Sequence, residues 1–330
     1  MISGNSVIFQ TGKETTYGTA ATGTKQDKIS SESLKPVYNK IDEGLATGGR
    51  GAGLKATMGI GVEGSFSTLM RPDMAYWLKY LLGVESVDEA TEGYTHTFTA
   101  IESGESSHLP SFTAYVDRKV KKCKYTGCKV NSATLSASAG DYLKLDVTVN
   151  GMDDAYADSL ASLSPSSLRA FKFAQAKLYT GSYDSNTGTF TGTELADVKE
   201  FSLEWNNNLD AQTQTTSTGA YYKEPEVNTR EATIQTSLIY ATAAETVREA
   251  YYKSDATLGL KIELISDEMI EEEEPYKMTI IIPCVQCSDA DANMGDPNSS
   301  ISQNMTFDLV DNLEDELIII KVDNGDSSAY

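Results

Sequence analysis

The sequence predicts a mainly β protein made of two tandem β-rich units, each with one flanking helix. One observation is strand alternation: in Tyr142–Asn150, Leu and Val alternate with polar residues, so one face packs and the other is solvated. The other observation is a passage that occurs twice. Tyr125–Ser132 precedes that strand, and Ile282–Ser288 precedes a second alternating strand, Ser302–Asp311. Upstream of each copy we expect a strand, a long polar loop, a strand and a helix.

The first unit is expected over residues 1–155. A strand at Met58–Met70 leads to a helix opened by Pro72, because proline favours the first helical turn. Before that strand lies a loop, residues 41–55, that is too rich in glycine to form regular structure on its own. Its glycines are Gly44, Gly48, Gly49, Gly51 and Gly53.

A connector with a short hairpin is expected over residues 156–197. This stretch is rich in Ser, Asp, Ala and Gly, and Asn186-Thr-Gly188 is typical of a turn between two strands.

The second unit is expected over residues 198–330. Its long polar loop, residues 207–228, is followed by a strand at Glu231–Tyr240 and a second helix. Thr242 and Glu245 have the spacing of a capping box, so Thr242 is expected to be the N-cap of that helix.

Composition indicates a folded, strongly acidic protein. The 330 residues are 40% hydrophobic, which is enough for a core, and 27 Lys and Arg stand against 48 Asp and Glu, a net charge of −21. Such an excess argues against gripping a phosphate backbone by ion pairs, which requires dense Lys and Arg.

Membrane association is not expected. The apolar runs are much shorter than the roughly 20 residues that a membrane helix needs. The chain starts without a basic region followed by an apolar core, so we expect no secretory signal and synthesis in a cytoplasm.

No catalytic, cofactor-binding or metal-binding residues are predicted. The cysteine pairs, Cys123 with Cys128 and Cys284 with Cys287, lack the tight turns of a zinc ribbon and are interpreted as free thiols. Gly59–Gly64 matches G-x-G-x-x-G, but the sequence continues as a strand where a dinucleotide site needs a helix. A carbohydrate-active enzyme is the rival interpretation, and it would need two carboxylates in a cleft lined by aromatic residues.

The chain resembles the tail tube (major tail) proteins of long-tailed bacteriophages. The resemblance is strongest over residues 50–155 and repeats more weakly over residues 195–325. It is carried by Glu63–Ser67, the helix after Pro72, Tyr94–Phe98, Tyr125–Ser136 and the strand that ends at Asp146–Gly151. It implies that each unit is a β-sandwich with one flanking α-helix.

The resemblance also implies a structural virion protein with no enzymatic activity. Its subunits would join their sheets into a β-barrel ring, rings would stack into a tube, and DNA would pass through an acidic channel without specific binding. The loops would be arms that order on stacking, with candidates Gly44, Gly48, Gly49, Gly51, Gly53, Thr213, Thr216 and Gly219. Candidates that face the lumen are Asp146, Thr148, Asn150 and Glu263.

Two questions stay open from the sequence. With two units per chain, a ring needs three copies and has pseudo-sixfold symmetry, whereas a single unit would require a hexamer. Besides other copies, the expected partners are the tail-tip, terminator and tape measure proteins. The alternative is a tail-tip, terminator or other tail attachment protein of similar β fold, present as a single ring.

Overall fold

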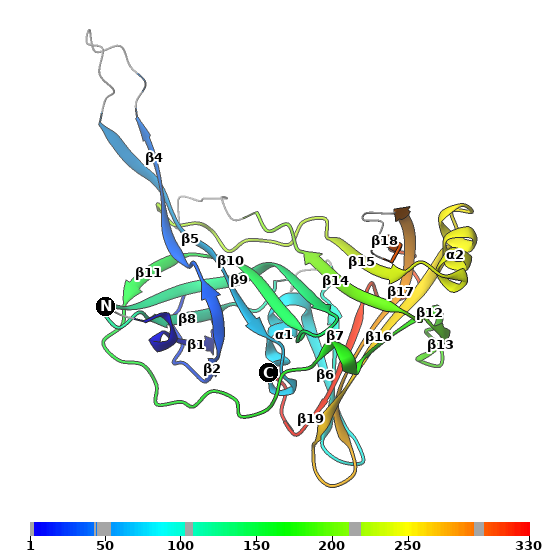
Figure 1. Ribbon diagram of the computed structural model, residues 1–330. Coiled ribbons are helices and arrows are strands. Elements are labelled where there is room, and N and C mark those ends of the chain that lie inside the picture. Colours follow the sequence, from blue (N-terminus) through cyan, green and yellow to red (C-terminus); the bar gives the residue numbers. More distant parts are fainter. Residues whose placement is uncertain (1–2, 43, 45–53, 103–107, 211–218, 294–299) are drawn as a thin grey trace.

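The computed structural model describes residues 3–42, 44, 54–102, 108–210, 219–293 and 300–330, and these residues form a mainly β protein (Figure 1). We call the part from β1 to β11 the first half and the part from β12 to β19 the second half.

The first half contains one α-helix and the strands β1 to β11. Their bounds are β1 Ile8–Lys13, β2 Lys25–Asp27, β3 Ile29–Glu32, β4 Lys35–Asp42, β5 Lys55–Leu69, α1 Tyr76–Leu82, β6 Gly83–Glu89, β7 Tyr94–Ala100, β8 Phe112–Asp117, β9 Lys122–Ser138, β10 Lys144–Gly151 and β11 Asp153–Tyr156.

The second half contains the other α-helix and the strands β12 to β19. Their bounds are β12 Ala176–Asp184, β13 Thr189–Glu194, β14 Val198–Asn206, β15 Glu231–Ile239, α2 Thr242–Val247, β16 Thr257–Met269, β17 Pro275–Asn293, β18 Ser302–Leu309 and β19 Ile319–Asn324.

One sheet runs through both halves, and we call it the long sheet. Its strands follow the order β4, β5, β10, β9, β14, β15, β18, β17, all antiparallel, with β3 beside β5 in line with β4. Its two end strands do not pair with each other, so the chain by itself is not a closed barrel. A barrel would therefore require several copies.

Each half adds a second layer that packs on the long sheet. The beginning of β9 leaves the long sheet and pairs with β8 and β11, and β1 and β2 follow beyond β8. The beginning of β17 likewise pairs with β16 and β19, and β12 and β13 follow beyond β16. Strands β9 and β17 thus pass from one layer to the other.

The pairing order is the same in the two halves. The first half reads β4, β5, β10, β9, β8, β1, and the second reads β14, β15, β18, β17, β16, β12. The strand register also shifts at matching places in the two halves. The shift between Thr148 and Val149 of β10 matches the shift between Thr306 and Phe307 of β18. Likewise, the shift between Ile29 and Ser31 of β3 matches that between Val198 and Glu200 of β14, and the shift between Phe112 and Ala114 of β8 matches that between Leu258 and Leu260 of β16.

One hairpin has no counterpart. Strands β6 and β7 lie between α1 and β8, whereas in the second half β16 is the first strand after α2. Strand β7 pairs with β19, so this hairpin of the first half extends the second layer of the second half. The two halves are therefore connected through both layers.

Helix α1 closes the core of the first half. The centroid of the Trp77 ring lies 4.6 Å from that of Phe66 on β5 and 5.3 Å from that of Phe112 on β8, so Trp77 contacts both layers. Pro72 opens this region as expected, but Pro72–Met74 forms a 3-10 turn before the α-helix. The helix stops at Gly83, whose φ of 100° favours glycine.

The predicted capping box of α2 is wrong. Ala241 is the N-cap, and Thr242 is the first helical residue. The Glu245 carboxylate pairs with Arg248 at 3.0 Å and Lys253 at 3.6 Å, so it does not reach back to the start of the helix. Two cations further along the chain, Arg248 and Lys253, thus bind the carboxylate that a capping box needs.

The hairpin predicted near Asn186-Thr-Gly188 is present as β12 and β13. The N–H of Gly188 donates to the backbone oxygen of Asp184, and its φ is 66°. Strand β12 also pairs with β16, so the hairpin belongs to the sheet of the second half. The extended segment between β11 and β12 runs beneath the first half (Figure 1).

Candidate assembly surfaces

The long sheet has one buried and one solvated face. On β10, Leu145, Val147 and Val149 are buried, while the residues between them point the other way. We call the solvated side the polar sheet face. Its acidic residues include Glu63, Asp146, Glu200, Glu204, Glu231, Asp289, Asp291 and Asp308, and its lysines include Lys35 and Lys144.

The rest of the polar sheet face is rich in hydroxyl groups. Next to Asp146 the neighbouring strands place Ser67 and Thr134, and Ser67 Oγ donates to the Asp146 carboxylate. Lys144 forms an ion pair with Asp141 at 2.6 Å, and this hydrogen bond raises the pKa of the Lys144 ammonium. The face thus presents mainly carboxylates and hydroxyls, and Lys144 is already paired.

Three of the four residues predicted to face the lumen lie together on this face. Asp146 and Thr148 are exposed and Asn150 is half-buried, all on β10. Glu263 lies elsewhere, on β16, in a second layer, and forms an ion pair with Lys277 at 2.9 Å. Burial raises the pKa of Glu263, but the bond from Lys277 and the charge of Lys261 outweigh it and lower the pKa overall.

Of the predicted arm residues, Gly44 and Gly219 fall within the described residues. The N–H of Gly44 donates to the Asp42 carboxylate at 3.0 Å, at the end of the β4–β5 hairpin that projects from the body (Figure 1). Gly219 begins the described last part of the loop between β14 and β15. Gly48, Gly49, Gly51, Gly53, Thr213 and Thr216 lie outside the described residues.

The described last part of that loop, residues 219–228, lies on the first half. The N–H of Ile60 donates to the oxygen of Ala220, and the N–H of Tyr222 donates back to the oxygen of Ile60. A Cβ on Gly61 would lie 2.4 Å from the Tyr222 ring, so only glycine fits there without a shift. Gly61, part of the G-x-G-x-x-G motif, therefore serves close packing inside a strand.

An ion pair made by a buried lysine holds the same segment in place. Lys129 on β9 is fully buried, and its ammonium lies 2.7 Å from the carboxylate of Glu224. Burial lowers the pKa of Lys129, while the bond to Glu224 raises it and only partly offsets burial. The loop of the second half is thus anchored on the first half.

The two halves meet edge to edge at β9 and β14. These strands are antiparallel, with Leu203 opposite Leu135 and Trp205 opposite Ala133. The N–H of Asn207 donates to the oxygen of Asn131. Because alternate residues of a strand direct their N–H and C=O groups to the same neighbour, Trp205 and Leu203 also direct theirs to β9. We call this contact the internal joint.

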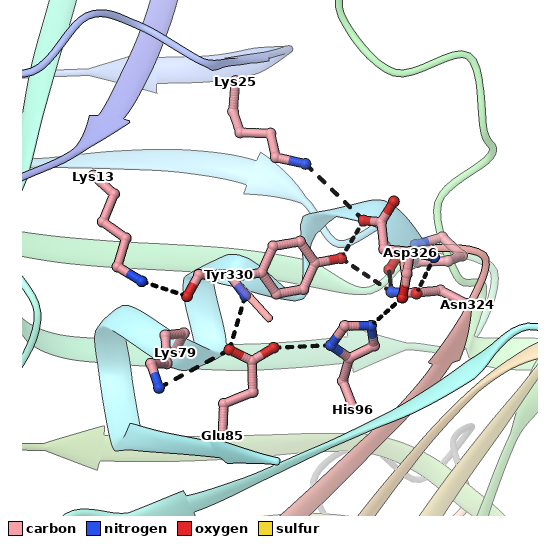
Figure 2. Close-up of polar contacts among 9 residues, drawn as sticks. Lys13, Lys25, Lys79, Glu85, His96, Asn324, Asp326 and Tyr330 are labelled. Carbon is pink, nitrogen blue, oxygen red and sulfur yellow. Dashed lines mark hydrogen bonds and ion pairs between the residues drawn. The ribbon is translucent and has the colours of Figure 1, made fainter. Parts of the chain in front are cut away.

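A second contact between the halves is a buried polar cluster around Glu85 and His96 (Figure 2). Both side chains are fully buried, and His96 Nδ1 lies 2.8 Å from the Glu85 carboxylate. His96 Nε2 lies 2.8 Å from the backbone oxygen of Asp326. Because both neighbours are acceptors, both bonds form only when both ring nitrogens carry protons.

Tyr330 completes this cluster. Its N–H donates to the Glu85 carboxylate at 2.9 Å, its hydroxyl donates to Asp326, and its backbone oxygen accepts from Lys13 at 2.6 Å. The chain after β19 is thus tied to β1 and to the β6–β7 hairpin (Figure 2). Sequence spacing does not reveal this cluster, because its members are up to hundreds of residues apart.

Metal and thiol chemistry are not indicated by the described residues. They contain no group of three or more His, Cys, Asp or Glu side chains arranged to hold a metal ion. The four cysteines are free, and burial raises the pKa of Cys287 to about 11 and that of Cys128 further, which disfavours the reactive thiolate.

Comparison with known proteins identifies the family. The family model described as phage tail tube protein matches residues 4–308, nearly the whole chain. No curated protein matches the chain. In the part of the chain that the structure describes, each helix is too short or too polar to cross a membrane. With its mainly β fold and family match, the chain belongs to the phage tail tube proteins, a structural component of the virion.

Proposed function

We propose that this chain assembles into stacked rings that form the wall of a tail tube, with the polar sheet face lining the channel for DNA. The observation that carries the proposal is the composition of that face. Its carboxylates and hydroxyls give DNA phosphates few cations to bind, so DNA would slide without being held. Asp146, Thr148 and Asn150 would then face the lumen, and Glu263 would not.

The shared pairing order supports a chain of two tandem β-sandwich units. We propose units over residues 1–155 and 198–330, with residues 156–197 as the connector, although β12 and β13 of that stretch pair with the second unit. If the contact between copies repeats the internal joint, three chains close a ring with pseudo-sixfold symmetry. The family match favours a tube of many rings over the single ring of a tail-tip or terminator protein.

The proposed partners follow from this role. Other copies form the rings, the glycine-rich loop at residues 41–55 would contact an adjacent ring, and the tail-tip and terminator proteins would bind the two ends of the tube. The tape measure protein would occupy the channel during assembly. We propose synthesis in the host cytoplasm followed by incorporation into the tail.

Electron microscopy tests the proposal directly. Purified chain, or particles that contain it, should show tubes of stacked rings with a central channel. A chain that stays monomeric and is absent from purified tails contradicts the proposal.

Thiol labelling tests which face lines the channel. In assembled tubes, Thr148→Cys should react with a small maleimide but resist a maleimide on a bulky polymer, because only small reagents diffuse along a narrow channel. Glu263→Cys is the matched control on β16 and should have the same access before and after assembly. Equal protection of both positions would show that the polar sheet face does not line the channel.

A further inference from the structure

The long sheet ends in two free edges within the described residues. One edge is β3 with β4, which pair only with β5, and the other is the last part of β17, residues 287–293, which pairs only with β18. In the matched pairing order, β4 corresponds to β14, and the last part of β17 corresponds to the last part of β9. Inside the chain, the counterparts of these two edges form the internal joint.

The shared register shifts fix which positions correspond. Counting from the shifts at Ile29/Ser31 and Val198/Glu200, Leu34 matches Leu203 and Pro36 matches Trp205. Counting from the shifts at Thr148/Val149 and Thr306/Phe307, Thr134 matches Asp291.

We propose that the last part of β17 pairs antiparallel with β4 of a second copy of this chain, in the register of the internal joint. In the internal joint, the opposed pairs are Leu203 with Leu135, Glu204 with Thr134 and Trp205 with Ala133. At the matching positions of the proposed contact, the opposed pairs are Leu34 with Ala292, Lys35 with Asp291 and Pro36 with Ala290. This inference rests on the proposed ring and specifies its contact.

Charge supports this register. Lys35 and Asp291 are both exposed, and in the described part of the chain neither has an ion-pair partner. Directly opposite on neighbouring antiparallel strands, an ammonium and a carboxylate attract each other. The pair would lie on the polar sheet face, where Asp291 would neutralise the charge of Lys35.

Backbone hydrogen bonding supports it as well. Pro36 has no N–H, so it cannot donate to the strand opposite. Its proposed partner, Ala290, already has its backbone oxygen bonded to Arg248 Nε at 2.9 Å. The position that lacks a donor therefore faces an acceptor that is already satisfied.

The β4 edge is protected in the free chain. The N–H of Leu34 donates to the Glu32 carboxylate at 3.2 Å, and its oxygen accepts from Arg118 and from the Tyr125 hydroxyl. At the matching position in the second half, β9 supplies the neighbouring strand. Side chains thus take the place of the missing strand, which limits pairing with unrelated edges. On assembly, Ala292 of the next copy would replace Glu32 as the acceptor for Leu34.

Charge reversal is the first test. Lys35→Glu and Asp291→Lys should each raise the concentration needed for assembly by roughly three- to tenfold, since like charges then face each other. The double variant should return to within about twofold of the wild type. Lys177→Glu, at an exposed lysine on β12 in the second layer of the second half, carries the same charge change away from both edges and should assemble normally. Single variants with no effect, or a double variant without recovery, would overturn the register.

Cysteine cross-linking is the second test and does not depend on the strength of the ion pair. Because Leu34 directs its backbone groups to the free edge, Lys35 and Asp291 would form a non-hydrogen-bonded pair, whose Cβ atoms are close enough for a disulfide. Under mild oxidation, the Lys35→Cys/Asp291→Cys variant should give covalent oligomers that end at the trimer. Lys35→Cys alone and Asp291→Cys alone keep the four native cysteines; they are the controls and should give none.

The outcomes separate the joint from the function. Tubes seen by microscopy without cross-links would overturn this joint while leaving the proposed function standing. Cross-links that extend to a closed hexamer would retain the joint and overturn the trimer. A wild-type chain that never oligomerises would overturn both. Circular dichroism of each variant establishes that it folds.

Discussion

The two halves share one pairing order, but one strand edge is covered in the second half and open in the first. Trp205 on β14 is 2% exposed, and its Nε1 donates to Asn207 at 2.9 Å beneath the internal joint. The matching position on β4 is Pro36, which is half-buried on a free edge. The same place in the fold thus holds a large core residue where a strand covers it and a proline where none does, as is typical of edge strands.

The largest loss of stability should come from a substitution at Trp205, the position on β14 that β9 covers. Trp205→Ala removes a buried ring from the core and should lower the free energy of unfolding by about 3–5 kcal/mol. Pro36→Ala, at the matching open position, should change it by about 0.5 kcal/mol or less. Urea denaturation of the dispersed chain measures both.

Glu204→Ala is the control for strand propensity at the internal joint, because Glu204 is exposed beside Trp205. It should cost about 0.5 kcal/mol or less. Equal losses for Trp205→Ala and Pro36→Ala would mean that the two edges are equally buried in the free chain, contrary to the comparison.

The Glu85–His96 contact should give the next largest effect, and it should depend on pH. Burial lowers the pKa of His96, but the bonds to Glu85 and to the Asp326 oxygen outweigh it and raise the pKa above its ordinary value of about 6.5. The contact should therefore contribute fully to the free energy of unfolding below about pH 6.5, and this contribution should be lost as the pH rises through the raised pKa of His96. Glu85→Gln should cost about 1–3 kcal/mol at low pH and flatten this dependence.

Urea denaturation across that pH range measures the effect. Lys25, at 4.0 Å from Asp326, is present in both proteins, whereas Lys79, at 3.9 Å from Glu85, loses its partner in Glu85→Gln. The flattening of the pH dependence, and not the size of the loss, therefore reports on His96. His108, the second histidine, provides the control: His108→Gln should leave the pH profile unchanged. A Glu85→Gln profile that is parallel to the wild type would show that His96 does not titrate through this contact.

An effect of similar size is expected where the loop of the second half contacts the first half. Gly61→Ala places a Cβ against the Tyr222 ring and should cost about 1–3 kcal/mol through overpacking. It should also weaken the contact of residues 219–228 with the first half. Limited proteolysis would detect this as faster cleavage within that segment. Gly4→Ala, with no atom within 4 Å of the added Cβ, is the matched control.

The smallest effect should come from the polar sheet face. Asp146→Asn keeps the hydrogen-bond acceptor for Ser67 and should change the free energy of unfolding by about 0.5 kcal/mol or less. A large loss would show that Asp146 supports the fold, and the polar sheet face would then be a structural network.

Much of the fold was predictable because alternation survives in the long strands. Tyr142–Asn150 alternates strictly, and β10 is Lys144–Gly151 with its apolar side buried. The family resemblance is confirmed, as is the mainly β class. The wrong cap at Thr242 arose because local spacing does not show that Arg248 and Lys253 compete for Glu245.

The candidate surfaces were less predictable, because they depend on which strands become neighbours. Asp146 and Glu263 both lie between apolar residues of alternating strands, and only the strand pairing places them in different layers. Arg118 and Arg248, which occupy backbone oxygens at the two free edges, belong to no local motif. Their partners are far away in sequence, so spacing carries no signal for them.

The internal joint also has a kinetic consequence. Because β9 and β14 belong to one polypeptide, each meets the other at an effective concentration set by the connecting chain, of millimolar order for short flexible linkers. Dilution of the protein leaves that contact unchanged and acts only on contacts between chains. If the rings form as proposed, half of the joints between units lie within a chain and are complete once that chain has folded. The concentration of the chain would then control only the joints between chains.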